Sequence, residues 1–223
     1  MVVESVSKKA KKTFTDLLRV RFKGILDPVG AALNRAGLTP DSVTLLGLAG
    51  NTVGACLLAT GHITWGGILV LLMGPLDALD GTMARLRGVT SPFGAFLDSV
   101  TDRYSELIIY AGLMIYFLAH GGWLGAGLAY FAAAGSVLVS YVKARAQSLG
   151  FDSETGLLTR VERYIVLVPL LVVNLPVIAL AVVAVLANFT ALQRILYVRN
   201  QAQERKKLAS GQENVVPPAN LER

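Results

Sequence analysis

The chain has 223 residues, of which 53% are hydrophobic and only 16% are charged. This balance excludes an ordinary soluble domain and predicts an all-α, polytopic membrane protein. The formal net charge of +6 does not indicate nucleic acid as a partner, because basic residues beside apolar spans set topology and meet membrane lipids. The single cysteine, Cys56, excludes a disulfide framework.

A basic, amphipathic region of residues 1–36 precedes the apolar spans. From Phe14 to about Leu33 apolar residues alternate with arginines and lysines, which predicts one or two short helices that lie in the membrane interface and break near Pro28. A soluble amphipathic helix packed on the body of the protein fits the pattern equally well. The first 25 residues lack an apolar core followed by a cleavage site, so we expect no removable signal peptide.

Six apolar segments follow, and they predict six transmembrane helices. Their expected spans are residues 41–60, 64–86, 93–118, 122–147, 157–174 and 176–200. The turns between them are short, which implies that consecutive helices are antiparallel neighbours. We therefore expect one six-helix domain over residues 37–200, followed by a polar, disordered C-terminal tail at residues 201–223.

The distribution of charge predicts the orientation of these helices. When both termini and the loops at residues 86–93 and 147–157 are placed on one side, all 21 lysines and arginines fall on that side or in the adjoining helix halves. By the positive-inside rule that side is cytoplasmic. The sequence therefore predicts a multi-pass protein of the cell membrane with both termini in the cytoplasm.

Four carboxylates stand in the second and third apolar segments, at Asp77, Asp80, Asp98 and Asp102. Ionisable residues within membrane-spanning sequence are costly and mark function. The first two are three residues apart and the last two are four apart, so each pair shares one helical face. Because a short loop joins the two segments, we expect the pairs to face each other at matching depth, where their oxygens suit hard divalent cations.

Two alternative roles for the carboxylates stay open. They could be buried and paired with Arg85, Arg87 and Arg103, although four carboxylates against few local bases leave charge uncompensated. They could also form a proton or ion pathway. A pathway does not account for the glycines clustered beside the carboxylates, nor for the position of Arg85 one turn beyond Asp80.

The acidic stretch resembles the signature of the CDP-alcohol phosphotransferase family. Eight positions over 26 residues match without departure: Asp77, Asp80, Gly81, Ala84, Arg85, Gly94, Asp98 and Asp102. The resemblance extends over about residues 35–200 and implies six membrane spans with a cytoplasmic active site. It also implies an enzyme, a transferase that attacks a CDP-linked lipid with an alcohol, forms a phosphodiester and releases CMP.

The resemblance implies roles for the four carboxylates. Asp77, Asp80, Asp98 and Asp102 would hold two Mg²⁺ ions, with Mn²⁺ also suited to carboxylate oxygens. Asp102 would in addition be the catalytic residue that accepts the proton of the acceptor hydroxyl.

Further residues of the resemblance would bind the CDP-lipid. Gly81 would let the nucleotide approach the backbone, Arg85 would neutralise diphosphate charge, and Ser91 matches a family hydroxyl that contacts the nucleotide lipid. The family's entrance to the first span is matched more weakly by Pro40, Asp41, Ser42, Val43 and Thr44. A plain helix cap accounts for that entrance stretch as well.

Basic residues in the later segments suggest the acceptor. Lys143 lies near the cytoplasmic end of the fourth segment, Arg160 and Arg163 open the fifth, and Arg194 lies in the sixth. Topology alone would place bases there, but as a group they are better explained by a phosphate monoester. In the family resemblance Lys143, Arg160 or Arg163, and Arg194 would grip the phosphate of the acceptor.

These bases resemble the prokaryotic phosphatidylinositol-phosphate synthase branch of the family. That branch implies CDP-diacylglycerol as donor and a phosphorylated polyol, inositol 1-phosphate, as acceptor, with phosphatidylinositol phosphate and CMP as products. Glycerol 3-phosphate also carries a phosphate, so a phosphatidylglycerol-phosphate synthase is the nearest alternative. A membrane ion or proton transporter is the alternative from another class. The family also implies a homodimer, which the sequence itself does not indicate.

Overall fold

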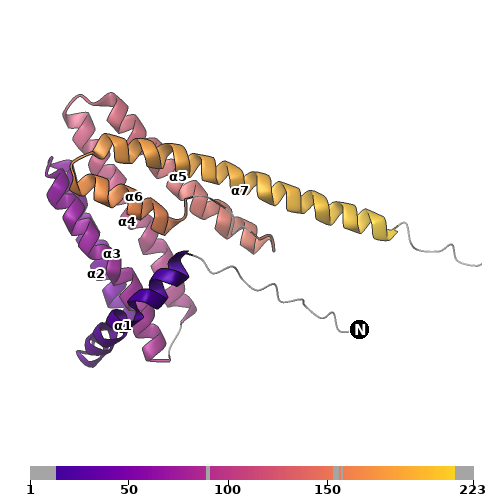
Figure 1. Ribbon diagram of the computed structural model, residues 1–223, viewed down its shortest axis with the longest axis horizontal. Helices are drawn as coiled ribbons and strands as arrows, with labels where there is room; N and C mark the ends of the chain where they lie inside the picture. Colours follow the sequence, from indigo (N-terminus) through magenta and orange to yellow (C-terminus); the bar gives the residue numbers. More distant parts are fainter. Residues whose placement is uncertain (1–13, 89–90, 153–155, 157, 214–223) are drawn as a thin grey trace, which may run out of the picture. The chain divides into compact units, whose positions relative to one another are not determined.

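The computed structural model describes residues 14–88, 91–152, 156 and 158–213 (Figure 1). The described residues form helices joined by short connections and contain no strand, which confirms the all-α prediction. In chain order the helices are α1 (Phe14–Arg35), α2 (Pro40–Ala59), α3 (Ile63–Leu86), α4 (Pro92–Ala119), α5 (Trp123–Ser148), α6 (Arg160–Val172) and α7 (Pro176–Glu213).

Four of the helices, α2, α3, α5 and α7, are long and apolar enough to cross a membrane. The α4 helix is not among them, because its first 15 residues carry Asp98, Asp102, Arg103 and Glu106. The α6 helix has 13 residues and is about 20 Å long at 1.5 Å per residue, which is short of the ~30 Å hydrocarbon core. The prediction of six spans therefore stays a prediction.

The chain divides into two compact units. Unit 1 comprises the described part of residues 1–50 together with Leu71–Asp102, and unit 2 comprises Asn51–Val70 together with the described part of residues 103–223. Each of α2, α3 and α4 contributes one part to each unit.

Unit 1 is built where α1 packs against α2 and α3. Its small core holds Val43, Leu79 and Met83, against which Leu26 and Leu33 of α1 are packed and partly buried. Such burial of apolar side chains stabilises the contact by roughly 25 cal/mol for each Å² removed from water. The inner face of α1 is therefore packed on the body of the protein, which was one of the two expectations for this region.

Polar contacts add to the attachment of α1. The side-chain amide of Asn34 donates to the carbonyl oxygen of Met83 at 3.2 Å. Arg87 donates to Asn34 Oδ1 at 2.7 Å and to the carbonyl oxygen of Leu38 at 2.6 Å. Helix α1 also runs through Pro28 without interruption, so the expected break there is wrong. A proline removes one helical hydrogen bond, and the packing of the flanking leucines compensates for that loss.

Unit 2 holds the larger core, in which α5 and α7 lie side by side (Figure 1). Close approach depends on Gly135 of α5, because a Cβ there would come within 3.0 Å of Ala187 Cβ and 2.6 Å of Asn188 Nδ2. Asn188 in turn donates to the carbonyl oxygen of Phe131 at 3.0 Å. Small residues at helix crossings and side-chain to backbone hydrogen bonds are typical of packing inside membranes.

The α6 helix is fixed to the unit 2 part of α3. A Cβ at Gly67 would lie 2.9 Å from both Leu171 Cβ and the backbone nitrogen of Val172, so the two backbones touch at this glycine. The phenol of Tyr164 donates to the carbonyl oxygen of Val70 at 2.6 Å. Together these contacts hold α6 against α3 at Tyr164 and at its last turn, while its first turn carries two of the predicted acceptor bases.

Helix α7 continues to Glu213, so residues 201–213 are helical where the sequence predicts a disordered tail (Figure 1). The residues after Asn200 are mostly good helix formers, namely Gln, Ala, Glu, Arg, Lys and Leu, and no proline occurs before Pro217. High polarity favours disorder in an isolated segment, but a helix already nucleated by an apolar span can propagate through polar residues at little cost. Residues 214–223 lie outside the described residues.

Candidate functional site

The four predicted carboxylates all belong to unit 1. Asp77 and Asp80 lie on α3, while Asp98 and Asp102 lie on α4. Asp80 is only 6% exposed, and the charges of Asp98 and of Asp77 both act on it. The fold therefore brings Asp80 of α3 and Asp98 of α4 within electrostatic reach of each other.

Two hydrogen bonds hold the Asp80 carboxylate. The hydroxyl of Thr44, from α2, donates to Oδ2 at 2.5 Å, and the backbone N–H of Gly81 donates to Oδ1 at 2.5 Å. Thr44 is itself buried, so its hydroxyl orients Asp80 away from bulk water. The sequence resemblance places Thr44 at the CDP-lipid, and no spacing rule relates a residue of α2 to one 36 positions later.

The ligand atoms that the four aspartates offer are of the type that a hard divalent cation binds. They are carboxylate oxygens, which suit Mg²⁺ and Mn²⁺, and each oxygen of Asp80 keeps a lone pair after its hydrogen bond. In the part of the chain that the structure describes, however, no three His, Cys, Asp or Glu side chains stand grouped so that they could hold an ion. The residue chemistry fits a metal, and the side-chain positions do not by themselves gather three ligands.

Gly81 and Arg85 lie over one another on α3. Among the described residues, and apart from the backbone of its own helix, a Cβ at Gly81 would lie nearest to the Nη1 nitrogen of Arg85, at 3.4 Å. The Nη2 nitrogen of Arg85 donates to the hydroxyl of Thr82 at 2.8 Å, and that hydroxyl donates to the carbonyl oxygen of Ala78. Thr82, which the sequence did not single out, thus orients an exposed guanidinium beside an open stretch of backbone.

Ser91 caps the start of α4. Its hydroxyl oxygen accepts the backbone N–H of Gly94 at 2.8 Å, and Pro92 occupies the first helical position. A Cβ at Gly94 would lie 3.1 Å from that hydroxyl and 3.5 Å from Asp41 Oδ1, so the starts of α2 and α4 lie together. The predicted lipid contact of Ser91 and the observed cap use the same oxygen, which has a second lone pair.

The entrance stretch of α2 is a helix start. The hydroxyl of Thr39 accepts the backbone N–H of Ser42 at 3.2 Å and is 2.6 Å from the Ser42 hydroxyl. The carbonyl oxygen of Pro40 lies 3.1 Å from the Thr44 hydroxyl. Val43 is 2% exposed and belongs to the core of unit 1, so its side chain packs against Leu79 and Met83. A helix cap therefore accounts for Pro40 and Ser42, whereas Val43 packs in the core and Thr44 donates to Asp80.

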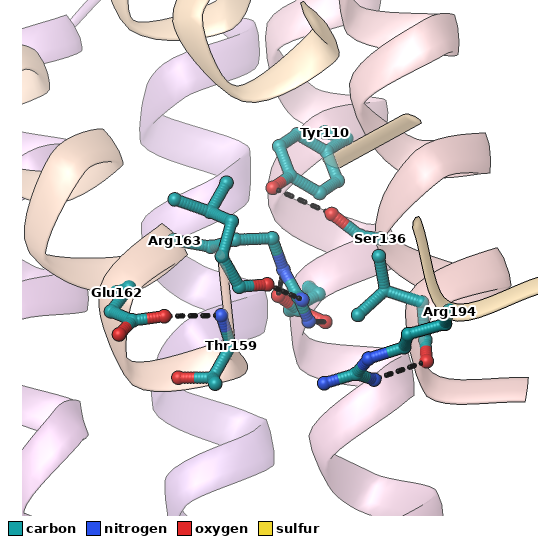
Figure 2. A network of polar contacts seen from close by, with 9 residues as sticks. Tyr110, Ser136, Thr159, Glu162, Arg163 and Arg194 are labelled. Carbon is teal, nitrogen blue, oxygen red and sulfur yellow. Dashed lines mark hydrogen bonds and ion pairs between the residues drawn. The ribbon is translucent and has the colours of Figure 1, made fainter. Parts of the chain in front are cut away.

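The buried bases lie in unit 2, and Figure 2 shows their network. Arg163 of α6 is 1% exposed, and its Nε and Nη2 nitrogens each donate to one oxygen of Glu106 on α4 at 2.9 Å. Its Nη1 nitrogen donates to the carbonyl oxygen of Leu158 at 3.4 Å. A two-point pair of this kind is the strong form of an ion pair, so Arg163 is committed to Glu106. Sequence reasoning did not single out Glu106, although it follows Asp102 by one helical turn on α4.

Arg194 is the second buried guanidinium of this network (Figure 2). It is 3% exposed, and its Nη1 nitrogen donates to the carbonyl oxygen of Val139 on α5 at 2.7 Å. The charge of Arg163 acts on Arg194, so two like charges share this part of the core with the carboxylate of Glu106. A Cβ at Gly156 would come within 3.1 Å of Arg194 Nε, which places the α5–α6 connection against this guanidinium.

The remaining two predicted bases are less buried. Lys143 on α5 and Arg160 at the start of α6 are both partly exposed. The start of α6 is fixed by Glu162, whose carboxylate accepts the backbone N–H of Thr159 at 2.5 Å (Figure 2). This contact is half of a capping box, and it sets the backbone from which Arg160 projects. The structure thus places all four predicted bases in unit 2, two of them deep and two near the surface.

Comparison with known proteins identifies relatives of this chain. A family described as CDP-alcohol phosphatidyltransferase matches residues 37–196, a range that includes the whole acidic signature. The phosphatidylinositol phosphate synthase of Mycobacteroides abscessus is 43% identical over 154 residues, which is 67% of this chain and 69% of that protein. The phosphatidylinositol phosphate synthase of Streptomyces avermitilis is 38% identical over 202 residues, which is 83% of this chain and 82% of that protein.

Solved structures of a third relative share the fold. The crystal structure of Mycobacterium tuberculosis phosphatidylinositol phosphate synthase with CDP-DAG bound has a TM-score of 0.73 at 29% identity and covers 90% of this chain and 98% of that one. A structure of the same protein in complex with manganese and citrate has a TM-score of 0.74 at 29% identity and covers 89% of this chain and 93% of that one.

Proposed function

The chain belongs to the CDP-alcohol phosphatidyltransferase family, as its acidic signature predicts, and we propose that it transfers a phosphatidyl group from CDP-diacylglycerol to inositol 1-phosphate. The oxygen of an acceptor hydroxyl attacks the phosphorus that carries the diacylglycerol, and the bond from that phosphorus to the CMP oxygen breaks. The products are phosphatidylinositol phosphate and CMP. The acceptor assignment is supported above all by Arg194, a buried guanidinium of unit 2, because a phosphate monoester is the ligand that such a base suits.

In this proposal Asp77, Asp80, Asp98 and Asp102 hold two divalent ions, Mg²⁺ or Mn²⁺. When bound, such ions neutralise phosphoryl charge and stabilise the attacking and the leaving oxygens. The chain itself supplies the orientation, since the Thr44 hydroxyl and the Gly81 N–H fix both oxygens of Asp80. A carboxylate held in this way loses little conformational entropy when a ligand arrives.

Asp102 is the residue to which we assign the proton of the acceptor hydroxyl. It is buried on the same helix as Asp98, four residues further along, so the two carboxylates share a face. Arg85 would neutralise diphosphate charge, and its hydrogen bond to Thr82 holds the guanidinium over Gly81. Gly81 would leave space for a nucleotide, because the nearest described atom beyond its own helix backbone is Arg85 Nη1, 3.4 Å from where a Cβ would stand.

The acceptor phosphate would be held by Arg194 together with Lys143 and Arg160. Arg163 has its three nitrogens engaged by Glu106 and Leu158, so of the two arginines on the first turn of α6 we assign the phosphate contact to Arg160. The Glu106–Arg163 pair then supports the site by fixing α6 to α4. A group of arginine and lysine side chains suits a dianion better than an uncharged alcohol.

The experiment is a panel of acceptors with purified protein, CDP-diacylglycerol and Mg²⁺, scored by release of CMP. We expect CMP release with inositol 1-phosphate, and little with free inositol or serine, which lack the phosphate. Preferred use of glycerol 3-phosphate would instead assign the chain as a phosphatidylglycerol-phosphate synthase. Ion flux in reconstituted vesicles without CMP release would contradict the transferase proposal altogether.

The same proposal includes a location and an assembly. The positive-inside distribution of charge supports a multi-pass protein of the cell membrane with its active site on the cytoplasmic side. Homodimerisation is carried over from the family resemblance alone. Chemical cross-linking in native membranes tests the dimer, and a strictly monomeric pattern would contradict it.

A further inference from the structure

Of the α5–α6 connection the structure describes residues 149–152, 156, 158 and 159, and the first of these form a defined turn. Its first residues close α5 with two hydrogen bonds, from the N–H of Gly150 to the carbonyl oxygen of Gln147 at 3.0 Å and from the N–H of Phe151 to that of Ala146 at 2.9 Å. Gly150 has φ of 73°, so this is a Schellman ending, which glycine favours. The turn presents the carbonyl oxygen of Gly150 and the ring of Phe151 in fixed positions.

Two residues from the extension of α7 hold this turn. The amide of Gln201 pairs with the backbone of Asp152 on both sides, accepting its N–H at 3.1 Å and donating to its carbonyl oxygen at 2.6 Å. Arg205 donates to the carbonyl oxygen of Gly150, and its guanidinium carbon stands 4.3 Å from the centre of the Phe151 ring. A cation over an aromatic face in this range is attractive. The four contacts involve three consecutive residues of the connection.

The far end of the same connection also rests on α7. A Cβ at Gly156 would meet Thr190 Cγ2 at 2.7 Å and Arg194 Nε at 3.1 Å. The carbonyl oxygen of Leu158 accepts from Arg163, and α6 begins two residues later with Arg160. This end of the connection therefore lies directly against the two buried guanidiniums.

One face of α7 makes the contacts with Gly150, Phe151, Asp152 and Gly156. Thr190, Arg194, Gln201 and Arg205 are separated by four, seven and four residues, and at 100° per residue they fall within a sector of about 60°. Helix α7 thus carries Arg194, which we assign to the acceptor phosphate, in its apolar part. Its polar extension carries Gln201 and Arg205, which contact the α5–α6 connection. Because Arg194, Gln201 and Arg205 lie on one face of the same helix, their positions relative to one another are fixed.

From this arrangement we propose that Gln201 and Arg205 are positioning residues for acceptor binding. They hold Gly150, Phe151 and Asp152, at the start of the α5–α6 connection, on the same face of α7 that carries Arg194, the base that Gly156 lies against. Neither residue touches the acceptor in this proposal, which rests on the proposed function because it concerns the same phosphate-binding bases. The polar extension of α7 is then part of the enzyme's specificity apparatus and not a tail.

The test compares Gln201→Ala, Arg205→Ala and the double variant with the wild-type full chain in lipid nanodiscs. CMP release is measured while inositol 1-phosphate and CDP-diacylglycerol are varied in turn. We expect the KM for the acceptor to rise about two- to five-fold in each single variant, the loss expected from one exposed cation–π or hydrogen-bonded contact, and further in the double variant. The kcat and the KM for CDP-diacylglycerol should stay within about two-fold of wild type, because that donor is assigned to residues of unit 1.

Two control variants sharpen the test. Lys206→Ala removes the same charge one residue further along α7 from an exposed position, and it should leave the acceptor KM unchanged. Phe151→Tyr keeps an aromatic face under Arg205 and should behave as wild type, whereas Phe151→Ala should resemble Arg205→Ala. Thermal unfolding of each variant in the same nanodiscs separates a binding effect from a loss of folded protein.

An unchanged acceptor KM in the double variant would overturn the proposal. An equal loss in kcat and in both KM values would overturn it as well, since that pattern shows a structural contact without a role in acceptor binding. Failure of the proposed function is seen in the wild-type chain, as CMP release that requires glycerol 3-phosphate or does not occur. If glycerol 3-phosphate is the acceptor, a raised KM for it with an unchanged kcat and an unchanged KM for CDP-diacylglycerol would still support the positioning role.

Discussion

The acidic region of unit 1 and the basic region of unit 2 handle buried charge in opposite ways. The acidic region gathers carboxylates of like charge from α3 and α4, and Asp80 is stabilised by two neutral donors, Thr44 and Gly81. The basic region includes its own counter-charge, because Glu106 forms a two-point pair with Arg163. A region that carries its own counter-ion is stable as folded protein, whereas one that concentrates a single sign is suited to bind ligands of the other sign.

The largest effect is expected from a substitution in the acidic region of unit 1. Asp98→Asn removes one negative oxygen while keeping the shape of the side chain, and it should lower CMP release by more than the about 10- to 100-fold that loss of an outer metal partner costs. The measurement is kcat at saturating CDP-diacylglycerol and acceptor. Chelation with EDTA should abolish wild-type activity and added Mg²⁺ or Mn²⁺ should restore it. A variant with wild-type kcat would refute the metal assignment.

Removing the ion pair of the basic region in unit 2 should lower the stability of the folded protein. Glu106→Ala leaves the guanidinium of Arg163 buried without its carboxylate, which costs about 3–5 kcal/mol in comparable buried pairs. Thermal or denaturant unfolding in detergent measures this loss. The matched control is the double variant Glu106→Leu with Arg163→Met, which removes both charges and should recover most of the stability. If single and double variants are equally unstable, the ion pair is not what Glu106 contributes.

Arg194 separates binding of the acceptor from binding of the donor. Arg194→Ala removes a charged hydrogen-bond donor worth about 1.5–3 kcal/mol, so the KM for inositol 1-phosphate should rise about 10- to 100-fold. The KM for CDP-diacylglycerol should change little. Arg194→Lys keeps the charge without the forked donors, so its KM for inositol 1-phosphate should lie between those of the wild type and of Arg194→Ala. Equal increases in both KM values would count against an acceptor-binding role for this arginine.

The smallest effect concerns the orientation of Asp80. Thr44→Val replaces the hydroxyl by a methyl group of similar size and removes one donor to the carboxylate, a loss of about 0.5–1.5 kcal/mol. We expect kcat to fall about two- to ten-fold with the acceptor KM unchanged. Thr44→Ser keeps the hydroxyl and should retain nearly full activity. A drop in Thr44→Ser as large as in Thr44→Val would indicate packing, not the hydrogen bond.

The acidic side was predictable because its information is local. The carboxylates, glycines and Arg85 fall within 26 consecutive residues, and helical spacing alone places each pair on one face. The start of α2 was likewise predictable, from Thr39 with Pro40. Contacts at a distance were not predictable, and the bond from Thr44 to Asp80 joins residues 36 positions apart.

The basic side shows where a residue type is a poor guide to its role. Arg160 and Arg163 are one turn apart and equivalent in sequence, yet Arg163 is buried against Glu106 while Arg160 is partly exposed. The polar end of α7 presents the same problem, since its composition fits a disordered segment and its contacts with the α5–α6 connection fit a helix. In both cases the partner that decides the role lies more than 45 residues away.

By itself, the sequence determined that this chain is helical, belongs in a membrane and carries a metal-suited set of carboxylates within a family signature. Those properties follow from composition, periodicity and short-range spacing, which are fixed before the chain folds. Only the tertiary structure decided which guanidinium is neutralised by Glu106, which hydroxyl orients Asp80, and that one face of α7 supports the α5–α6 connection. Those pairings depend on burial and on long-range packing, because a charged or polar group takes its role from whatever partner the fold brings to it.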